Sequence, residues 1–278
     1  MSAAGERIAK KMAAAGLCSR REAERWITAG RVKIDGQVIA TPAIVVTDEM
    51  SVLVDDKPLA TAPASRVWLY HKPVGLLTTH HDPQGRPTIF ESLPPSMPRV
   101  ISIGRLDLNS EGLMLLTNDG AIARYAELPS TGWARSYRVR VFGQVDEVAL
   151  VSLANGITID NVAYGRIEAE VLGELRTNTW VFITLYEGKN REIRKVMEHL
   201  GLRVNRLIRV SYGAFSLGDL KPGQVREVPR SELVKAFPGV VKAPQPFRPK
   251  KSKAEDDKIL KKGRGRFQKK RKERKGTL

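Results

Sequence analysis

The chain has 278 residues, of which 42% are hydrophobic, so it can bury the core of one large or two ordinary domains and is not wholly disordered. A formal net charge of +17 and a pI near 10.1 favour a polyanionic partner. The single cysteine excludes an intramolecular disulfide and a thiolate metal cluster, and it fits the reducing cytoplasm, where we expect the protein to lie. The longest uncharged runs, 36–47 and 148–159, are too short to span a bilayer, so we expect no membrane partner.

The beginning of the chain carries the signals of two helices and a hairpin. Apolar residues at helical spacing predict a short helix over 6–15. The sequence Ser-Arg-Arg-Glu at 19–22 is a capping box, which predicts the start of a second helix. Alternation over 31–34 predicts a strand, and Asp-Gly at 35–36 predicts a tight hairpin turn. We therefore expect a small α+β module.

Basic side chains are concentrated in this module. A charge run on a helix is usually a solvated face, and composition alone leaves solvation and RNA contact equally open. The order Gly-Leu-Cys-Ser-Arg-Arg-Glu-Ala-Glu, followed by Gly-Arg-Val-Lys-Ile-Asp-Gly, resembles the S4 RNA-binding domain over about residues 5–60. In that domain, the helices and the following turn present basic groups to folded RNA. The resemblance implies RNA contacts from Arg7, Lys10, Lys11, Arg20, Arg21, Arg25, Arg31 and Lys33.

The chain beyond this module mixes predicted strands and helices in an irregular order. Strands are expected at 67–70, 113–116, 137–142, 180–186 and 202–210, with weaker strands within 157–172. Helices are expected at 147–154 and 191–200. This order favours an α+β domain with a mixed, largely antiparallel sheet over a repeating βαβ arrangement. The expected organisation is a first domain over 1–60, a linker over 61–66, a second domain over 67–240 and a tail over 241–278.

The tail holds most of the excess positive charge. Residues 241–278 contain 16 Lys and Arg against 4 Asp and Glu, with little apolar material. This composition predicts a disordered basic arm. The arm serves solubility or nonspecific contact with RNA phosphates, and the charge favours the second interpretation.

One carboxylate stands in the polar half of a long motif, Gly-Arg-Leu-Asp-Leu-Asn-Ser-Glu-Gly-Leu-Met-Leu-Leu-Thr-Asn-Asp-Gly, at 104–120. The apolar run 113–116 predicts a short buried strand closed by a turn, so Asp107 and Arg105 lie on a loop that the strand fixes in place. Spacing alone favours local turn hydrogen bonds for Asp107 over a role in chemistry.

The complete motif resembles the catalytic motif of the RsuA/RluB family of ribosomal RNA pseudouridine synthases, most closely the large-subunit enzymes, and the likeness covers about residues 5–235. The resemblance implies that Asp107 is the essential catalytic carboxylate and that Arg105 takes part in displacing the target base. It also implies a redox-neutral isomerisation without cofactor or metal. The implied partner is ribosomal RNA, of the large or alternatively the small subunit, or an assembling ribosomal subunit. We expect a monomer.

A second segment, Glu-Gly-Lys-Asn-Arg-Glu-Ile-Arg-Lys at 187–195, enters a helix that Asn190 can cap. The segment resembles another motif of the family, in which the later arginine pairs with the catalytic carboxylate. The resemblance therefore makes Arg194 the partner of Asp107, which would keep the carboxylate ionised and oriented. The alternative from the residues alone is a surface arginine that pairs with Glu198.

A third segment, Arg-Ser-Tyr-Arg-Val at 135–139, resembles the family motif Lys-x-Tyr-x-Val. Its tyrosine contacts the target base, which implies a catalytic role for Tyr137. Arg135 stands where the family usually has lysine, and the positive charge is kept. Without the resemblance, Tyr137 is better interpreted as a strand aromatic packed in the core.

Two other classes of function remain open. A non-catalytic RNA-binding factor for ribosome assembly would need only the S4 domain and the tail, but the intact catalytic set argues against it. A metal-dependent nuclease would use Asp107, Glu111 and Asp119. The four histidines form no recognisable ligand set, since adjacent ligands such as His80 and His81 seldom converge on one ion.

Overall fold

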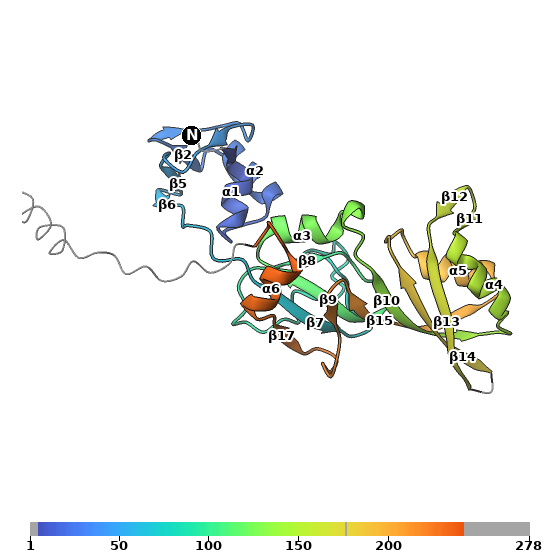
Figure 1. Ribbon diagram of the computed structural model, residues 1–278. Helices are drawn as coiled ribbons and strands as arrows, with labels where there is room; N and C mark the ends of the chain where they lie inside the picture. Colours follow the sequence, from blue (N-terminus) through green and yellow to red (C-terminus); the bar gives the residue numbers. More distant parts are fainter. Residues whose placement is uncertain (1–4, 176, 242–278) are drawn as a thin grey trace, which may run out of the picture. The chain divides into compact units, whose positions relative to one another are not determined.

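The computed structural model describes residues 5–175 and 177–241 (Figure 1). The basic arm predicted over 241–278 lies outside the described residues except for its first position. The described chain comprises an N-terminal domain of short helices and strands and a second domain built on one long sheet. The second domain's sheet is largely antiparallel and helices flank it, which confirms the α+β class predicted from the sequence.

The N-terminal domain packs two helices on short strands around one apolar cluster. Ser19 Oγ accepts a hydrogen bond from Glu22 N at 3.1 Å, and the Glu22 carboxylate accepts one from Ser19 N, so the predicted capping box is confirmed. Asp35 and Gly36 have positive φ, as the predicted hairpin turn requires. The elements are α1 (Ile8–Ala14), α2 (Arg20–Thr28), β1 (Glu6–Arg7), β2 (Val32–Ile34), β3 (Gln37–Val38), β4 (Val45–Val46), β5 (Val52–Val54) and β6 (Lys57–Pro58).

Among the described residues, nine strands form the sheet of the second domain. Each neighbouring pair is antiparallel except β9 with β15. A separate hairpin pairs β11 (Ile157–Ile159) with β12 (Val162–Tyr164). Across the sheet the order is β13 (Ile167–Leu175), β14 (Asn178–Leu185), β10 (Arg135–Phe142), β15 (Arg203–Tyr212), β9 (Glu111–Thr117), β7 (Val67–Lys72) and β17 (Val225–Glu227), with β8 (Ile101–Ile103) on β9 and β16 (Phe215–Ser216) on β15.

Burial along the strands separates the centre of the sheet from its outer part. Every residue of β7 and β9 is buried, which explains why the apolar residues at 67–70 and 113–116 follow one another without alternation. In β10 and β14, odd-numbered residues are buried and even-numbered residues are partly or fully exposed. We call the buried side the inner face, and the opposite side of β13, β14, β10 and β15 the outer face.

Helices cover the second domain at both ends of the sheet. The predicted α4 (Glu147–Ser152) and α5 (Glu192–His199) are confirmed, and Figure 1 shows them beside β13 and β14. Two helices in the described residues were not predicted, α3 (Gly120–Glu127) and α6 (Arg230–Ala236). Asp119, which the sequence placed in a closing turn, caps α3 by accepting a hydrogen bond from Ala121 N at 2.7 Å.

The start of α5 differs from the sequence-based prediction. Asn190 does not cap this helix; the N-cap is Arg191, whose side chain makes no capping bond. Arg191 adopts the left-handed conformation, with φ 52°, so the chain turns sharply before the helix begins. Ile193 and Met197 of this helix are buried and join the apolar cluster on the inner face.

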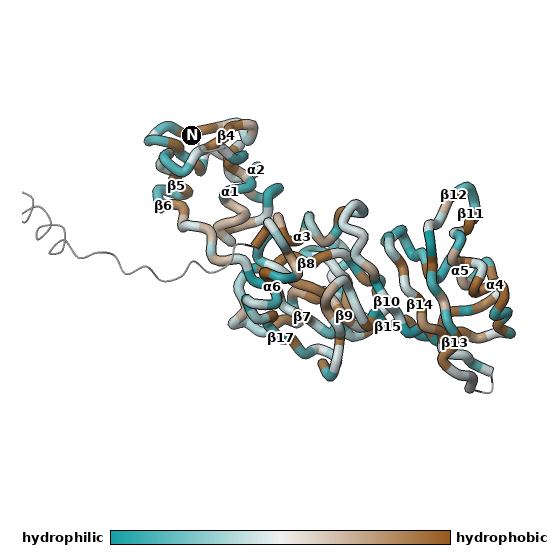
Figure 2. The backbone as a smooth tube through the Cα atoms, in the orientation of Figure 1, coloured by the Kyte–Doolittle hydropathy of each residue, from teal (hydrophilic) through white to brown (hydrophobic). Residues whose placement is uncertain are grey.

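Apolar side chains form two clusters in the second domain, one on each side of the sheet. The inner cluster joins α5 to β10 and β14, and the other places α3 and α6 against β7 and β9. In Figure 2, hydrophobic residues follow β7 and β9, the strands that lie between these two clusters. The loop between β8 and β9 is therefore attached to the most buried part of the molecule, and this loop carries Asp107.

Candidate active site

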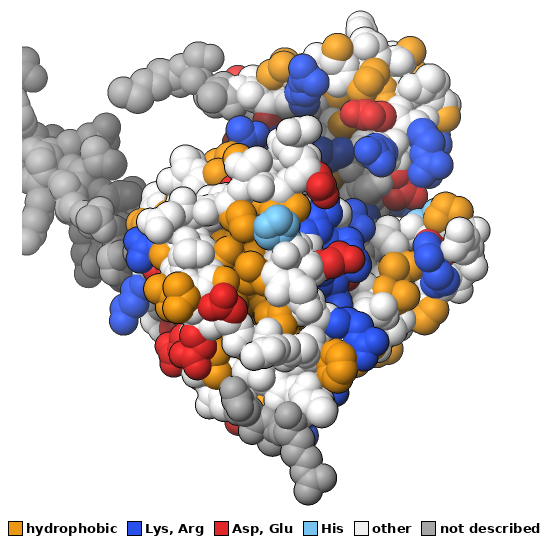
Figure 3. Space-filling view, turned by 90° about the vertical axis from the view of Figure 1, so that its right-hand side faces the viewer, with side chains coloured by type: hydrophobic (Ala, Val, Ile, Leu, Met, Phe, Trp, Pro, Cys, Tyr) orange, Lys and Arg blue, Asp and Glu red, His pale blue; other side chains and the backbone are white. Residues whose placement is uncertain are grey.

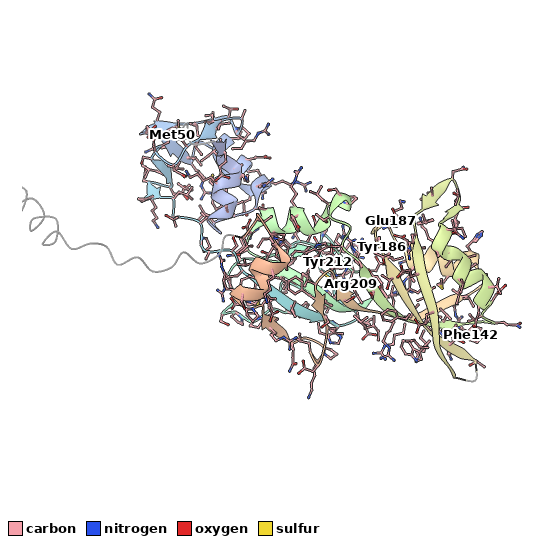
Figure 4. All side chains as sticks on the ribbon, in the orientation of Figure 1. Met50, Phe142, Tyr186, Glu187, Arg209 and Tyr212 are labelled. Atoms are coloured by element: carbon pink, nitrogen blue, oxygen red, sulfur yellow. The ribbon has the colours of Figure 1, made fainter. Side chains whose placement is uncertain are left out.

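A cleft of about 460 Å³ opens on the inner face of the sheet. Its lining comes mainly from the loop at 104–110, the inner side of β10 and β15, and the segment at 187–194, and Glu127, Pro129 and Leu185 complete it. In Figure 4, Arg209 and Tyr212 lie near the middle of the domain, and Glu187 lies beyond the end of β14. The cleft thus brings together the three segments that the sequence singled out, although they are far apart along the chain.

Asp107 lies on the loop at the edge of this cleft. Its carbonyl accepts a hydrogen bond from Ser110 N at 3.0 Å, which closes a tight turn. Its side chain is 36% exposed, and its Oδ2 lies 3.5 Å from Nη1 of Arg191. The carboxylate is therefore accessible from the cleft and has a cation beside it, as a nucleophile or an electrostatic group requires.

A buried lysine holds the backbone of the same loop. Lys72 is fully buried at the end of β7, and its Nζ donates to the carbonyl oxygens of Asp107 at 3.1 Å and Ser110 at 2.8 Å. Burial lowers the pKa of Lys72 to about 8, and the nearby carboxylate of Asp107 opposes this shift. The available signal for this role was a Lys-Pro pair directly after a predicted strand.

The predicted ion pair between Arg194 and Asp107 is wrong. Arg194 Nη2 donates to the carbonyl oxygen of Asn109 at 2.9 Å, and Nη1 donates to that of Val204 at 3.2 Å. Burial lowers the pKa of Arg194, and the positive charge of Arg191 adds to this shift. Arg194 therefore fixes the loop backbone, and Arg191 is the guanidinium that pairs with the carboxylate.

The sequence missed Arg191 because two arginines three positions apart compete for one carboxylate. The left-handed backbone at Arg191, with φ 52°, costs a non-glycine residue roughly 1 kcal/mol or more. This turn directs Arg191 to the cleft, while the helix that follows turns Arg194 toward the loop carbonyls. A positive φ cannot be recognised from the residue type alone at an arginine.

Tyr137 lies on the inner side of β10 and lines the cleft, with 8% of its surface exposed. It also belongs to the apolar cluster under the cleft, so the core interpretation and the site interpretation both describe its position. In the sheet it stands opposite Arg209, which is buried and donates through Nε to Leu113 O at 2.7 Å. The floor of the cleft therefore combines an aromatic ring with a buried cation.

Arg135 occupies the position where the resembling family usually has lysine. It is buried, and its Nη1 donates to Trp133 O at 2.7 Å while Nη2 donates to the phenol oxygen of Tyr212 at 3.0 Å. Its guanidinium also stacks over the Tyr212 ring. Arg105, by contrast, is exposed, and it also lines the cleft.

Glu192 is a further carboxyl group of the cleft wall, with Glu127 and Glu187, and the sequence did not single it out. Its Oε2 accepts a hydrogen bond from Lys189 N at 3.0 Å, and within the described chain its buried Oε1 has no partner. Burial raises the pKa of Glu192 to about 7, although the hydrogen bond from Lys189 opposes this. The Glu-x₄-Glu spacing at 187 and 192 was the available signal.

Comparison with known proteins decides the family of this site. A model of the RNA pseudouridylate synthase family matches residues 66–199, and an S4 domain model matches residues 6–52. An uncharacterised RNA pseudouridine synthase of Rickettsia bellii is 49% identical over 223 residues, which are 80% of this chain and 96% of that protein. The chain belongs to the RNA pseudouridine synthases. It is an isomerase of the uridine base, as the sequence predicted.

Further relatives and one solved structure agree with this membership. The ribosomal large subunit pseudouridine synthase B of Pasteurella multocida is 42% identical over 219 residues, covering 77% of this chain and 64% of that protein. A solved pseudouridylate synthase structure superposes with a TM-score of 0.60 at 25% identity, over 84% of this chain and all of the other.

The basic residues of the S4 domain of this synthase divide into two groups. Lys10, Lys11, Arg31 and Lys33 form ion pairs with acidic side chains of the same domain. Arg7, Arg20, Arg21 and Arg25 are exposed, and among the described residues they form no ion pair. The second group is therefore the more available to RNA phosphates. Figure 3 looks instead at the end of the second domain where β13 and β14 lie, and it shows Lys and Arg side chains gathered near the middle of that face.

The three acidic residues proposed for a nuclease do not converge. Glu111 pairs with Arg206, and Asp119 caps α3 and accepts a hydrogen bond from Ser65. Within residues 5–175 and 177–241, no three His, Cys, Asp or Glu side chains are grouped as a metal site would require. In the same residues, no helix is long and apolar enough to cross a membrane.

Proposed function

We propose that this synthase converts one uridine of large-subunit ribosomal RNA to pseudouridine, in the cytoplasm and as a monomer, on free RNA or on an assembling subunit. Large-subunit synthases of Pasteurella multocida and Haemophilus influenzae, 42% and 40% identical, support this RNA class. The observation that carries the chemistry is Asp107, whose accessible carboxylate stands beside Arg191 on a loop held by Lys72.

The uridine must first leave its stack, because a stacked base cannot be attacked. Flipping a nucleotide costs a few kcal/mol, and binding in the cleft offsets this cost. The cleft volume of about 460 Å³ falls within the range of small-molecule sites. Arg105, which is exposed and lines the cleft, is placed to fill the gap that the flipped base leaves.

Asp107 then serves as the nucleophile. Its carboxylate forms a covalent bond with the sugar or the base, and the N1–C1′ bond of the uridine breaks. The uracil turns, a C5–C1′ bond forms, the C5 proton leaves, and N1 takes up a proton while Asp107 is released. The product is an isomer of the substrate, so the reaction balances without an oxidant or a cosubstrate. Covalent catalysis divides one difficult displacement into two easier steps.

The remaining cleft residues orient these groups. Tyr137 provides a ring on which the uracil stacks, and its phenol group assists removal of the C5 proton. Arg191 orients the Asp107 carboxylate through the contact at 3.5 Å. Arg194, which the resemblance made a catalytic partner, acts as a positioning residue through its hydrogen bond to the Asn109 carbonyl.

Mapping pseudouridines in ribosomal RNA from cells with and without this gene tests the proposal. We expect one large-subunit site to disappear and to return when the wild-type gene is restored. Loss of a small-subunit site would favour the other class of ribosomal substrate, and an unchanged map of both subunits would overturn the assignment. With purified protein, isomerisation should persist in EDTA, whereas a metal-dependent nuclease would lose its activity.

A further inference from the structure

The outer face of the sheet is a second surface with the chemistry of RNA recognition. On the inner face, α5 packs against β10 and β14. On the outer face, even-numbered residues of β10 and β14 and the facing residues of β15 are partly or fully exposed. The side chains that define this surface are Arg138, Arg140, Phe142, Trp180, Phe182 and Arg203.

Strand register sets arginines beside aromatic rings on this face. Arg138 of β10 lies opposite Phe182 of β14, and Arg140 lies opposite Trp180. The guanidinium of Arg138 lies 5.1 Å from the centre of the Trp180 ring, and that of Arg203 lies 5.0 Å from the Phe142 ring. These cation–π contacts hold the charged groups flat against the surface and leave their outer sides open to a ligand.

The charge of the outer face is positive and largely uncompensated. Among the described residues, Arg138, Arg140 and Arg203 form no ion pair, whereas Arg206 beside them is paired with Glu111. Two acidic residues of β13 lie on this side: Glu170, opposite Phe182, and Glu168, opposite Thr184 and paired with Arg166. The Nε of Arg140 is buried without a hydrogen-bond partner in the described chain. The face thus presents donors that an anionic ligand would satisfy.

The apolar part of the same surface is unusually open. Phe142 is 43% exposed, Trp180 and Phe182 are half-buried, and Figure 4 places Phe142 at the far end of the sheet. Rings alternating with cations suit single-stranded RNA, because bases stack on the rings while phosphates meet the arginines. A duplex would use the charges and leave the rings without a partner.

A hollow of about 270 Å³ continues this surface toward the centre of the sheet. Arg138 and His71 both line it. His71 is 8% exposed; its Nδ1 lies 2.7 Å from Leu220 O, and its Nε2 has no hydrogen-bond partner among the described residues. The hollow therefore has on its wall a buried ring nitrogen without a hydrogen-bond partner in the described chain, together with Glu111, which is paired with Arg206.

We propose that the outer face binds a second, single-stranded stretch of the RNA substrate, on the side of the sheet opposite the catalytic cleft. The proposal rests on the RNA substrate of the family, and it assigns to this face affinity but no part in the chemical step.

Binding of purified large-subunit ribosomal RNA at 50–300 mM KCl tests the proposal. The test variant carries Arg138→Glu and Arg203→Glu, and the matched control carries Arg124→Glu and Lys235→Glu, two exposed cations on α3 and α6 that form no ion pair within the described chain. At 100 mM KCl, we expect at least tenfold weaker binding for the test variant and less than threefold for the control. Losing two contacts to a single strand should also reduce the slope of log K against log salt by about 1.4.

Thermal melting of both variants establishes that they fold, and the neutral pair Arg138→Gln with Arg203→Gln separates lost contacts from repulsion. Irradiation of the wild-type complex at 254 nm should crosslink RNA to peptides that carry Phe142 or Trp180. Equal losses in the test and control variants would overturn the proposal. So would a loss seen with assembling particles but not with naked RNA, which would assign the face to a protein. If the ribosomal assignment itself failed, binding would still respond to the variants while no pseudouridine formed.

Discussion

Asp107 illustrates how the site fixes a backbone while leaving a side chain free to react. Lys72 and Arg194 donate hydrogen bonds to carbonyl oxygens of its loop, and Arg191 contacts the carboxylate itself. Positioning of this kind lowers the barrier because the reacting atoms are held in place before the reaction. The three cations therefore have different tasks, although the sequence presents two of them in one motif.

Replacing Arg191 or Arg194 by glutamine should separate these tasks. Arg191→Gln removes a half-exposed ion pair, so turnover should fall while stability changes by only about 0–1 kcal/mol. Arg194→Gln leaves partly buried carbonyl groups without their donors, so turnover should fall and stability should drop by about 1–3 kcal/mol. Pseudouridine formation at saturating RNA and urea denaturation measure the two effects. Equal destabilisation by both substitutions would contradict this division.

The buried carboxyl of Glu192 should make stability depend on pH. Its pKa of about 7 in the folded chain exceeds the ordinary value of 4.5, so the folded state holds a proton that the unfolded state has lost between these limits. Stability contributed by this group is present below pH 4.5 and is lost as pH rises through 7. Glu192→Gln should therefore gain roughly 1–3 kcal/mol relative to wild type between pH 5 and pH 8. Thermal melting at both values measures the difference, and parallel pH curves for the two proteins would refute it.

At the scale of elements, sequence patterns located the strands better than the helices of the second domain. β9 has an uninterrupted apolar run because both of its faces are buried. β10 and β14 alternate because only one of their faces is buried. Helix α3 was missed because its start, Asn-Asp-Gly, is also the sequence of a turn. Asp119 is typical both of a turn and of a helix N-cap, and the packing of α3 against β8 and β9 favours the helix over the turn.

The contact between β9 and β15 depends on one glycine. Gly112 has φ 105°, and a Cβ there would lie 2.3 Å from the carbonyl oxygen of Arg209. Gly112→Ala should therefore destabilise the second domain by more than about 3 kcal/mol. Gly223→Ala is the control, since Gly223 also has positive φ but has open space around its missing Cβ, and it should cost about 1 kcal/mol. Similar melting temperatures for the two variants would show that the close approach is unimportant.

At the scale of the whole molecule, the sequence predicted the architecture and the segments that meet at the cleft. Asp107, Tyr137 and Arg194 do line one cleft. Their individual contacts were not predictable, because they depend on the positive φ of Arg191 and on Lys72 reaching the loop carbonyls from a separate strand. The outer face was also missed, since it exists only when β10, β14 and β15 lie side by side in register.

The charge of the tail leads to a prediction for the whole chain. Residues 241–278 hold 16 Lys and Arg against 4 Asp and Glu, so deleting them should weaken RNA binding and reduce its salt dependence, because fewer counterions are released. The turnover rate at saturating RNA should change little, since no catalytic motif lies there. Binding at several salt concentrations beside single-turnover kinetics measures both quantities. A large loss of turnover with unchanged affinity would refute this role.

The most direct test of the central claim is Asp107→Asn. The substitution keeps the size and most of the hydrogen-bonding capacity of the side chain, and the pair that it removes is partly exposed, so the fold should survive. An amide is a far poorer nucleophile than a carboxylate, so pseudouridine formation should fall below detection while RNA affinity and the melting temperature stay near wild type. Turnover at the wild-type rate in a well-folded Asp107→Asn protein would contradict the mechanism.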